Sequence, residues 1–168
     1  MIISEHYLLK NMKELTIGDI APDFTMPSTN GSFSLHQELK KGPILLNFYI
    51  GDFGINCTNY MTKFIELKGE FDKTGVRIVC INPDSLESHK TWKDRMGSPF
   101  EYVHDEKQAV SKEYDAIVKD SPLVKGFTNR EFYLLDKEAK IKFIWKSPVP
   151  KILPDMNEIL EEVKDHLT

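Results

Sequence analysis

Hydrophobic and polar positions along this chain follow the periods of strands and of helices in turn. Residues 44–49 and 76–82 are two mostly apolar runs beside turn-forming residues, which is typical of strands covered on both faces of a sheet. Between them, over residues 56–73, apolar side chains recur on one helix face, and Gly75 ends the pattern. The sequence therefore predicts a buried strand, an amphipathic helix and a second buried strand in succession.

The remaining segments predict further strands and helices around this unit. Residues 28–31 carry a turn signal with Asn-Gly at its centre, which indicates a short hairpin. Ser85 is placed to cap a helix that runs to about Met96. The pattern also indicates a helical turn at 35–39, a short strand at 102–103, a short helix over 107–114, a hairpin of 131–135 and 140–145, and an amphipathic helix over 155–167. Strands interleaved with helices in this order predict an α/β protein with a mixed sheet.

A single domain is expected over residues 15–168, with residues 1–14 as an N-terminal extension. The recognisable pattern begins near Leu15, and no Gly/Ser-rich linker or internal repeat divides the chain after it. A chain of 168 residues fits one domain with a sizeable core. Met1 and Met12 both remain candidates for the start of translation.

Composition and charge narrow the classes of function. With a net charge of −4, the chain lacks the basic character that nucleic-acid binding requires, and no run of 18 apolar residues indicates a membrane span. Five scattered histidines and two cysteines lack the spacing of a metal site, and there is no Gly-rich phosphate loop. We therefore expect no metal and no cofactor. Two cysteines form no disulfide framework, which favours the reducing cytoplasm.

Cys57 is the candidate nucleophile. It lies where the first apolar run gives way to the predicted helix, so its thiol is expected at a helix N-terminus. Unpaired backbone N–H groups and the helix dipole favour a thiolate there, and the thiolate is the reactive form of cysteine. The position alone therefore points to thiol chemistry, against the alternative of a small buried hydrophobic residue.

Several motifs, in order and spacing, resemble those of one protein family over residues 15–168. The chain is similar to the peroxiredoxins of the alkyl hydroperoxide reductase C/thiol-specific antioxidant group, and most to the bacterioferritin-comigratory-protein branch. The resemblance rests on Gly18-Asp19-Ile20-Ala21-Pro22-Asp23-Phe24, Phe48-Tyr49, Gly51-Asp52-Phe53, Cys57-Thr58, Ile81-Asn82-Pro83-Asp84-Ser85, and Arg130 six residues before Asp136. It implies a thioredoxin-like fold, with a mixed central β-sheet flanked by helices and an N-terminal hairpin extension.

The resemblance also implies an activity and its residues. Cys57 stands where the family has its peroxidatic cysteine, and Arg130 where it has the arginine that stabilises the thiolate. The family motif Pro-x-x-x-Thr-x-x-Cys would run from Ile50 to Cys57, so Ile50 replaces the proline and Gly54 the threonine; Tyr60 stands where many members carry Glu. We expect an antioxidant oxidoreductase: a thiol-dependent peroxidase that reduces hydrogen peroxide or alkyl hydroperoxides.

The substrate is expected to bind beside Cys57. Tyr49 and Phe53 are predicted to shape the pocket wall, and the small Gly54 leaves room for a water or a bulkier ligand. Backbone N–H groups near residues 56–57 are expected to hold a peroxide oxygen. Asn56 and Thr58 are candidates to replace the missing threonine hydroxyl.

The reductant is expected to be an external thiol, such as thioredoxin or a small thiol. Cys80 lies mid-strand, which leaves two interpretations open: an inert core thiol, or a resolving cysteine for Cys57. Thr62 stands where many relatives carry their resolving cysteine, so a one-cysteine cycle is the default. The resemblance leaves a monomer and a homodimer equally open.

Two other functions compete with the peroxidase. The chain could be a catalytically degenerate redox sensor or binding protein, in which Ile50 and Gly54 reflect a relaxed site. Alternatively, it could be a monothiol disulfide oxidoreductase that exchanges mixed disulfides; no Cys-x-x-Cys is present for dithiol exchange.

Overall fold

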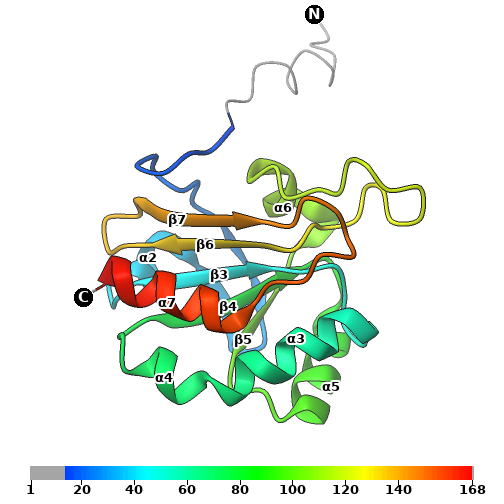
Figure 1. Cartoon of the computed structure of the whole chain (residues 1–168), viewed down its shortest axis with the longest axis horizontal. Coiled ribbons are helices and arrows are strands. Elements are labelled where there is room, and N and C mark those ends of the chain that lie inside the picture. Colours follow the sequence, from blue (N-terminus) through cyan, green and yellow to red (C-terminus); the bar gives the residue numbers. More distant parts are fainter. Residues whose placement is uncertain (1–13, 168) are drawn as a thin grey trace, which may run out of the picture.

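The computed structural model describes residues 14–167 (Figure 1). The predicted extension lies almost wholly outside this range, as does the choice between Met1 and Met12. Within it, no helix has the length and apolar content that crossing a membrane requires.

A mixed sheet forms the centre of the molecule, as the sequence predicts. Its strands lie in the order β2-β1-β5-β4-β3-β6-β7. Central β3 pairs in parallel with β4 and antiparallel with β6, so the sheet mixes both kinds of ladder. The strand bounds are β1 Thr25–Ser28, β2 Gly31–Ser34, β3 Ile44–Phe48, β4 Arg77–Asn82, β5 Glu101–His104, β6 Glu131–Leu135 and β7 Ile141–Lys146.

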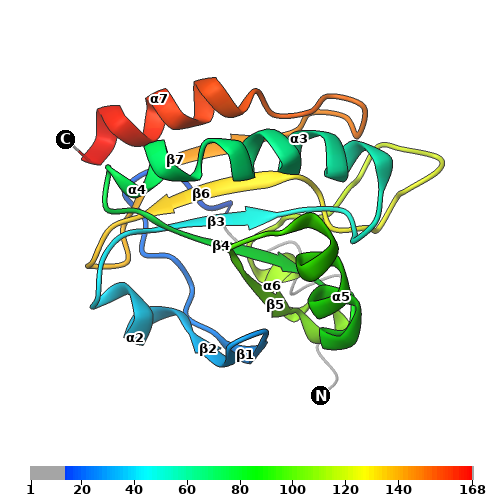
Figure 2. The same cartoon turned by 90° about the horizontal axis from the view of Figure 1, so that it is seen from below.

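Helices cover both faces of this sheet (Figure 2). Helices α3, α4, α5 and α7 pack on one face, and α2 and α6 on the other. The two apolar layers explain why β3 is buried at every position, because successive side chains of a strand point to opposite faces. The bounds are α2 Leu35–Leu39, α3 Ile55–Glu66, α4 Lys68–Asp72, α5 Leu86–Met96, the 3-10 helix η1 Glu106–Gln108, α6 Ala109–Glu113 and α7 Met156–Leu167.

Two of the predicted helices are interrupted. The helix expected over residues 56–73 divides at Leu67, whose φ of −85° and ψ of 2° leave the helical region, so α3 and α4 are separate. The helix expected over 107–114 is regular only in α6, because Lys107 and Gln108 adopt left-handed φ values of 55° and 56°. Apolar spacing runs through both breaks, so periodicity could not reveal them.

Helix α5 begins and ends at local signals in the sequence. The Ser85 hydroxyl accepts a hydrogen bond from the Ser88 backbone N–H at 3.1 Å, which confirms the predicted cap. At the other end Gly97 adopts a left-handed φ of 61°, which favours a residue without Cβ. This helix packs against the segment that leads from β3 to α3, so its bounds fix part of the candidate site.

Substitution of two glycines, Gly97 at the end of α5 and Gly69 within α4, should have opposite effects on stability. Gly97→Ala should lower the free energy of unfolding by about 1 kcal/mol, because a Cβ strains the left-handed conformation. Gly69→Ala should raise it by up to about 1 kcal/mol, since Gly69 is helical and has open space around its missing Cβ. Urea denaturation measures both; a stabilising Gly97→Ala would contradict the assignment.

Candidate active site

Cys57 lies in the first turn of α3. Gly54 is the N-cap of this helix, and because glycine has no side chain, no side-chain hydrogen bond caps the turn. The thiol is only 1% exposed. The predicted position of Cys57 at a helix N-terminus is therefore realised, with the backbone N–H groups of an uncapped turn beside the sulfur.

Arg130 brings a positive charge to this thiol from a distant part of the sequence. It immediately precedes β6, whose Glu131 pairs with Phe48 at the end of β3. Its side chain is 3% exposed, and its Nη2 lies 3.7 Å from Cys57 Sγ. Nη1 donates to the carbonyl of Pro150, while Nε has no partner among the described residues. The guanidinium thus places a positive charge and an N–H donor against the sulfur.

A cleft of about 870 Å³ opens beside the two residues. Three of the residues that line it are apolar and exposed to solvent: Ile55 is 80% exposed, Leu123 90% and Phe127 50%. The rest of the lining is Ile50, Gly51, Asp52, Gly54, Asn56, Cys57, Asp84, Asp120, Ser121, Pro122, Val124, Arg130, Val149, Pro150 and Lys151. The cleft therefore combines a thiol and a guanidinium with a largely apolar lining.

The structure brings Gly54 and Asn56 to this cleft but not Thr58. A Cβ on Gly54 would lie 3.7 Å from the Gly51 carbonyl oxygen and 4.0 Å from Cys57 Cβ, both ordinary contacts. A side chain would therefore fit at Gly54. Of the two candidates to replace the missing hydroxyl, Asn56 alone lines the cleft.

Tyr49 and Phe53 do not line the cleft, contrary to the prediction that they shape its wall. Tyr49 is fully buried and stacks on Trp92 at 5.3 Å between ring centroids, because the alternation of β3 directs it into the core under α5. Phe53 has a left-handed φ of 63°, and its ring lies 6.3 Å from Trp92 and 5.2 Å from the Arg95 guanidinium. Both residues anchor the segment before α3 instead.

Cys80 lies in the core, away from the cleft lining. It is fully buried on β4, and its sulfur accepts a hydrogen bond from Asn47 Nδ2 at 3.6 Å. Burial raises the pKa of the Cys80 thiol to about 12, so it stays protonated at neutral pH. Asn47 also accepts from the Tyr60 hydroxyl at 3.3 Å. These contacts favour the inert core thiol of the two interpretations.

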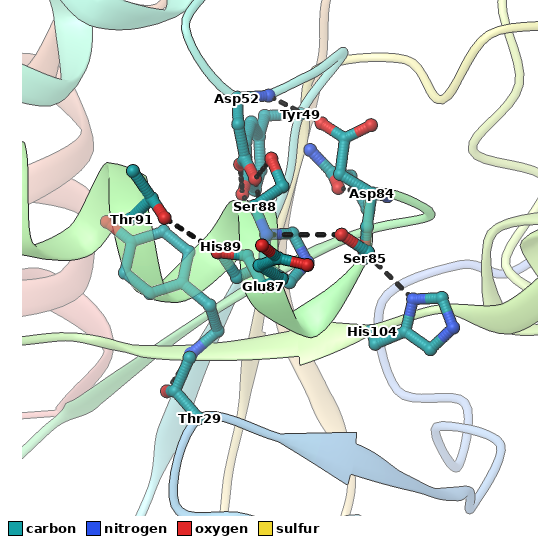
Figure 3. A network of polar contacts seen from close by, with 12 residues as sticks. Thr29, Tyr49, Asp52, Asp84, Ser85, Glu87, Ser88, His89, Thr91 and His104 are labelled. Carbon is teal, nitrogen blue, oxygen red and sulfur yellow. Dashed lines mark hydrogen bonds and ion pairs between the residues drawn. The ribbon is translucent and has the colours of Figure 1, made fainter.

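A buried polar network centred on Asp52 fixes the segment before α3 (Figure 3). The Asp52 carboxylate accepts from Tyr49 Oη at 2.5 Å and from Ser88 Oγ at 2.8 Å. Its backbone N–H donates to Asp84 Oδ2 at 2.7 Å, which links the segments that follow β3 and β4. Burial, and after it the negative charge of Asp52, raises the pKa of Tyr49 well above its usual value. The network therefore needs Tyr49 as a proton donor.

His89 completes this network as the partner of Asp52. Its Nδ1 lies 2.7 Å from Asp52 Oδ2, and its Nε2 lies 3.1 Å from the Val103 carbonyl oxygen. The carboxylate and the carbonyl are both acceptors, so the imidazole is held between them by its two ring nitrogens, and the fully buried His89 side chain contacts the Asp52 carboxylate directly. Sequence reasoning missed this pair; the only available signal was a histidine four residues after the Ser85 cap.

Comparison with known proteins relates the chain to thiol peroxidases. A sequence model of the AhpC/TSA family matches residues 17–144. A 1-Cys peroxiredoxin of Triticum aestivum is 29% identical over 94% of this chain and 75% of its own length. A putative bacterioferritin-comigratory peroxiredoxin of Coxiella burnetii is 28% identical over 84% of this chain and 92% of its own. The structure of a yeast mitochondrial 1-Cys peroxiredoxin matches with a TM-score of 0.75 and 25% identity, covering 89% and 75% of the two chains.

These matches confirm the resemblance inferred from the motifs, including the likeness to the bacterioferritin-comigratory branch. The thioredoxin-like fold is confirmed with it. Within residues 14–167, no group of three or more His, Cys, Asp or Glu side chains could hold a metal ion.

The Asp52 network should contribute more to the free energy of unfolding than its hydrogen bonds would contribute one by one. Asp52→Asn puts an amide, half of which is a donor, where Tyr49 and Ser88 donate to a carboxylate, so several buried contacts fail together and we expect the free energy of unfolding to fall by about 3 kcal/mol or more. Ser88→Ala removes one hydrogen bond and should cost about 1 kcal/mol. Urea denaturation of both variants provides the comparison. Equal losses would show that the Asp52 carboxylate contributes no more to stability than a single hydrogen bond.

Proposed function

Since this chain belongs to the AhpC/TSA family and is a thiol-dependent peroxidase, we propose that its reaction runs through Cys57 and Arg130. The observation that carries the proposal is the approach of Arg130 Nη2 to within 3.7 Å of Cys57 Sγ. The sulfur lies in the uncapped first turn of a helix at the edge of a cleft. The Cys57 sulfur, the positive charge of Arg130 and the cleft that can hold a substrate therefore lie next to one another.

In the first step the Cys57 thiolate attacks one oxygen of the peroxide. The S–O bond forms as the O–O bond breaks, so cysteine is oxidised to sulfenic acid while the peroxide is reduced to water or an alcohol. The leaving oxygen departs with the bonding electron pair and takes up a proton. The Arg130 guanidinium and the N–H groups of the first turn of α3 stabilise the negative charge that moves from sulfur to oxygen.

Gly54 makes this site different from the family motif. A threonine hydroxyl at that position would add a hydrogen bond to the reacting oxygens, and one such donor is typically worth two to three powers of ten in rate, or roughly 3 kcal/mol. We infer that the site compensates in part through the backbone N–H groups of the turn, which no N-cap side chain occupies. Asn56 is the remaining side-chain candidate for this role.

The second step returns Cys57 to the thiol through external reductants. An incoming thiol condenses with the sulfenic acid, which releases water and forms a mixed disulfide; a second thiol then displaces Cys57 and leaves as a disulfide. Cys80 does not serve as the resolving thiol in this cycle, because it is fully buried and protonated. The yeast mitochondrial 1-Cys peroxiredoxin is resolved via glutathione and thioredoxin systems, which supports a thiol of either kind here.

The setting of the enzyme follows from the one-cysteine cycle. A supply of free thiols is available in a reducing compartment, so we place the protein in the cytoplasm.

The peroxide is hydrogen peroxide or an alkyl hydroperoxide; the exposed apolar residues Ile55, Leu123 and Phe127 favour a peroxide with an apolar group. A monomer and a homodimer both remain compatible with the proposal.

Removal of the guanidinium should slow the first step strongly. In Arg130→Met we expect the second-order rate constant for oxidation of Cys57 to fall by about a hundredfold, since the charge beside the sulfur is lost. Rapid-quench mass spectrometry with hydrogen peroxide and with cumene hydroperoxide measures it. Arg77→Met, which removes an arginine paired with Glu38 at 2.7 Å, is the matched control and should react normally. A rate in Arg130→Met close to that of the native protein would sink the assignment of Arg130.

Restoring the hydroxyl should accelerate the enzyme. Gly54 has an ordinary negative φ and room for a Cβ, so Gly54→Thr should fold normally. We expect its rate with hydrogen peroxide to rise about tenfold or more, because the hydroxyl supplies the missing hydrogen bond. Gly54→Val has nearly the same shape without the hydroxyl and should gain nothing. If both variants change the rate equally, the effect is steric and the argument about the hydroxyl is wrong.

A further inference from the structure

Glu131 is a buried carboxyl directly behind Arg130. It is 1% exposed, at the first position of β6, and it belongs to the face of the sheet that carries Tyr133 and α6. Asn129 Nδ2 donates to Glu131 Oε2 at 3.0 Å, and Tyr133 Oη lies 2.9 Å from Glu131 Oε1. The peroxidase reaction described above does not use this group.

The contacts of Tyr133 indicate which form of Glu131 the structure accommodates. Tyr133 Oη lies within hydrogen-bond distance of two oxygens, Glu131 Oε1 at 2.9 Å and the Tyr114 carbonyl at 3.0 Å. A phenol has a single proton, so it satisfies only one acceptor. If Glu131 is protonated, its own O–H donates to Tyr133 and Tyr133 donates to the Tyr114 carbonyl. Neutral Glu131 therefore satisfies both contacts, and ionised Glu131 leaves one unsatisfied.

Asn129 connects this carboxyl to the loop that holds Arg130. The same Nδ2 that donates to Glu131 also donates to the Ser147 carbonyl at 3.1 Å. Ser147 in turn donates its backbone N–H to the Arg130 carbonyl at 3.0 Å. Three residues farther on, the Pro150 carbonyl accepts from Arg130 Nη1. Residues 147–150 are thus bonded to Glu131 through one amide and to the catalytic guanidinium directly.

Residues of this loop line two neighbouring pockets. A second pocket of about 240 Å³ lies over Glu131, Asn129 and Lys146. Its lining and that of the catalytic cleft have Asp120, Val149 and Pro150 in common. A change at Glu131 therefore acts on a loop that lines both the pocket over Glu131 and the catalytic cleft.

We propose that Glu131 is a positioning residue, whose proton sets, through Asn129 and the 147–150 loop, how Arg130 is held against Cys57. The inference rests on the proposed function of Cys57 and Arg130. Neutral Glu131 corresponds to the arrangement described here. When Glu131 ionises, it draws the proton of Tyr133 away from Tyr114 and strengthens the hydrogen bond that it accepts from Asn129, so Asn129 shifts the 147–150 loop and changes how Arg130 is held against Cys57.

The groups around Glu131 place this change near neutral pH. Burial raises the pKa of Glu131 to about 7, against the opposing effects of Lys146, Asn129 and Tyr133. Lys146 Nζ lies 3.7 Å from Glu131 Oε1 and 3.7 Å from a Glu14 carboxylate oxygen. Asp115, in the turn after α6, adds a negative charge on the same side. Glu131 is therefore neutral below about pH 7 and ionised above it.

Alkylation of Cys57 by iodoacetamide tests the proposal without requiring peroxidase turnover. Rates are measured by mass spectrometry from about pH 6 to about pH 8.5 for the native protein, Glu131→Gln, and the matched control Glu101→Gln in β5. We expect the ratio of the Glu131→Gln rate to the native rate to grow by about threefold or more across this range, because only in the native protein does residue 131 ionise and shift the loop that holds Arg130. The Glu101→Gln ratio should stay constant. A constant ratio for Glu131→Gln overturns the proposal.

Asn129→Ala separates positioning from a purely structural role. Carbon NMR of the Glu131 carboxyl should still show a titration in this variant, while the dependence of Cys57 alkylation on that titration is lost. If the dependence persists in Asn129→Ala, the route through Asn129 is wrong. If Glu131→Gln fails to fold, the alkylation measurement in Asn129→Ala tests the proposal by itself. Peroxide consumption, followed in parallel, tests the peroxidase itself: its absence would refute the proposed function while the alkylation ratios still judge Glu131.

Discussion

A buried guanidinium beside a buried thiol is the constraint on which the rest of this structure depends. Cys57 and Arg130 are 73 residues apart in sequence, and their contact exists only because β3 and β6 are neighbours. Burying the charge of Arg130 is costly unless its N–H groups find acceptors. The Pro150 carbonyl and the Cys57 sulfur are two of these acceptors, so the sheet, the start of α3 and the loop after β7 must form together.

The local part of this arrangement could be predicted from the sequence. Apolar runs bounded by turn residues predicted β3 and β4, and the position of Cys57 at a strand–helix junction predicted its place in the first turn of α3. Arg130 came from the order of motifs alone, since nothing in its own neighbourhood marks it. Such signals suffice where the structure depends on residues close together in the chain.

The rest depends on contacts between distant segments. The break at Leu67 and the left-handed Lys107 and Gln108 do not disturb the apolar spacing, so periodicity passes over them. Tyr49 and Phe53 were expected to shape the wall of the substrate pocket, but both pack against Trp92 of α5 instead. Asp52 with His89, and Glu131 with Asn129 and Tyr133, become visible only when the strands are paired in space.

The position of Trp92 has a practical consequence. Its indole lies near both the Tyr49 ring and Phe53, and is 1% exposed, so it contacts both ends of the segment that leads into α3. Oxidation or a mixed disulfide at Cys57 that moves this segment would change the surroundings of the indole. Trp92 is thus an intrinsic fluorophore placed to respond to movement of this loop in solution without a label, once the emission of the second tryptophan, Trp145, has been removed by substitution.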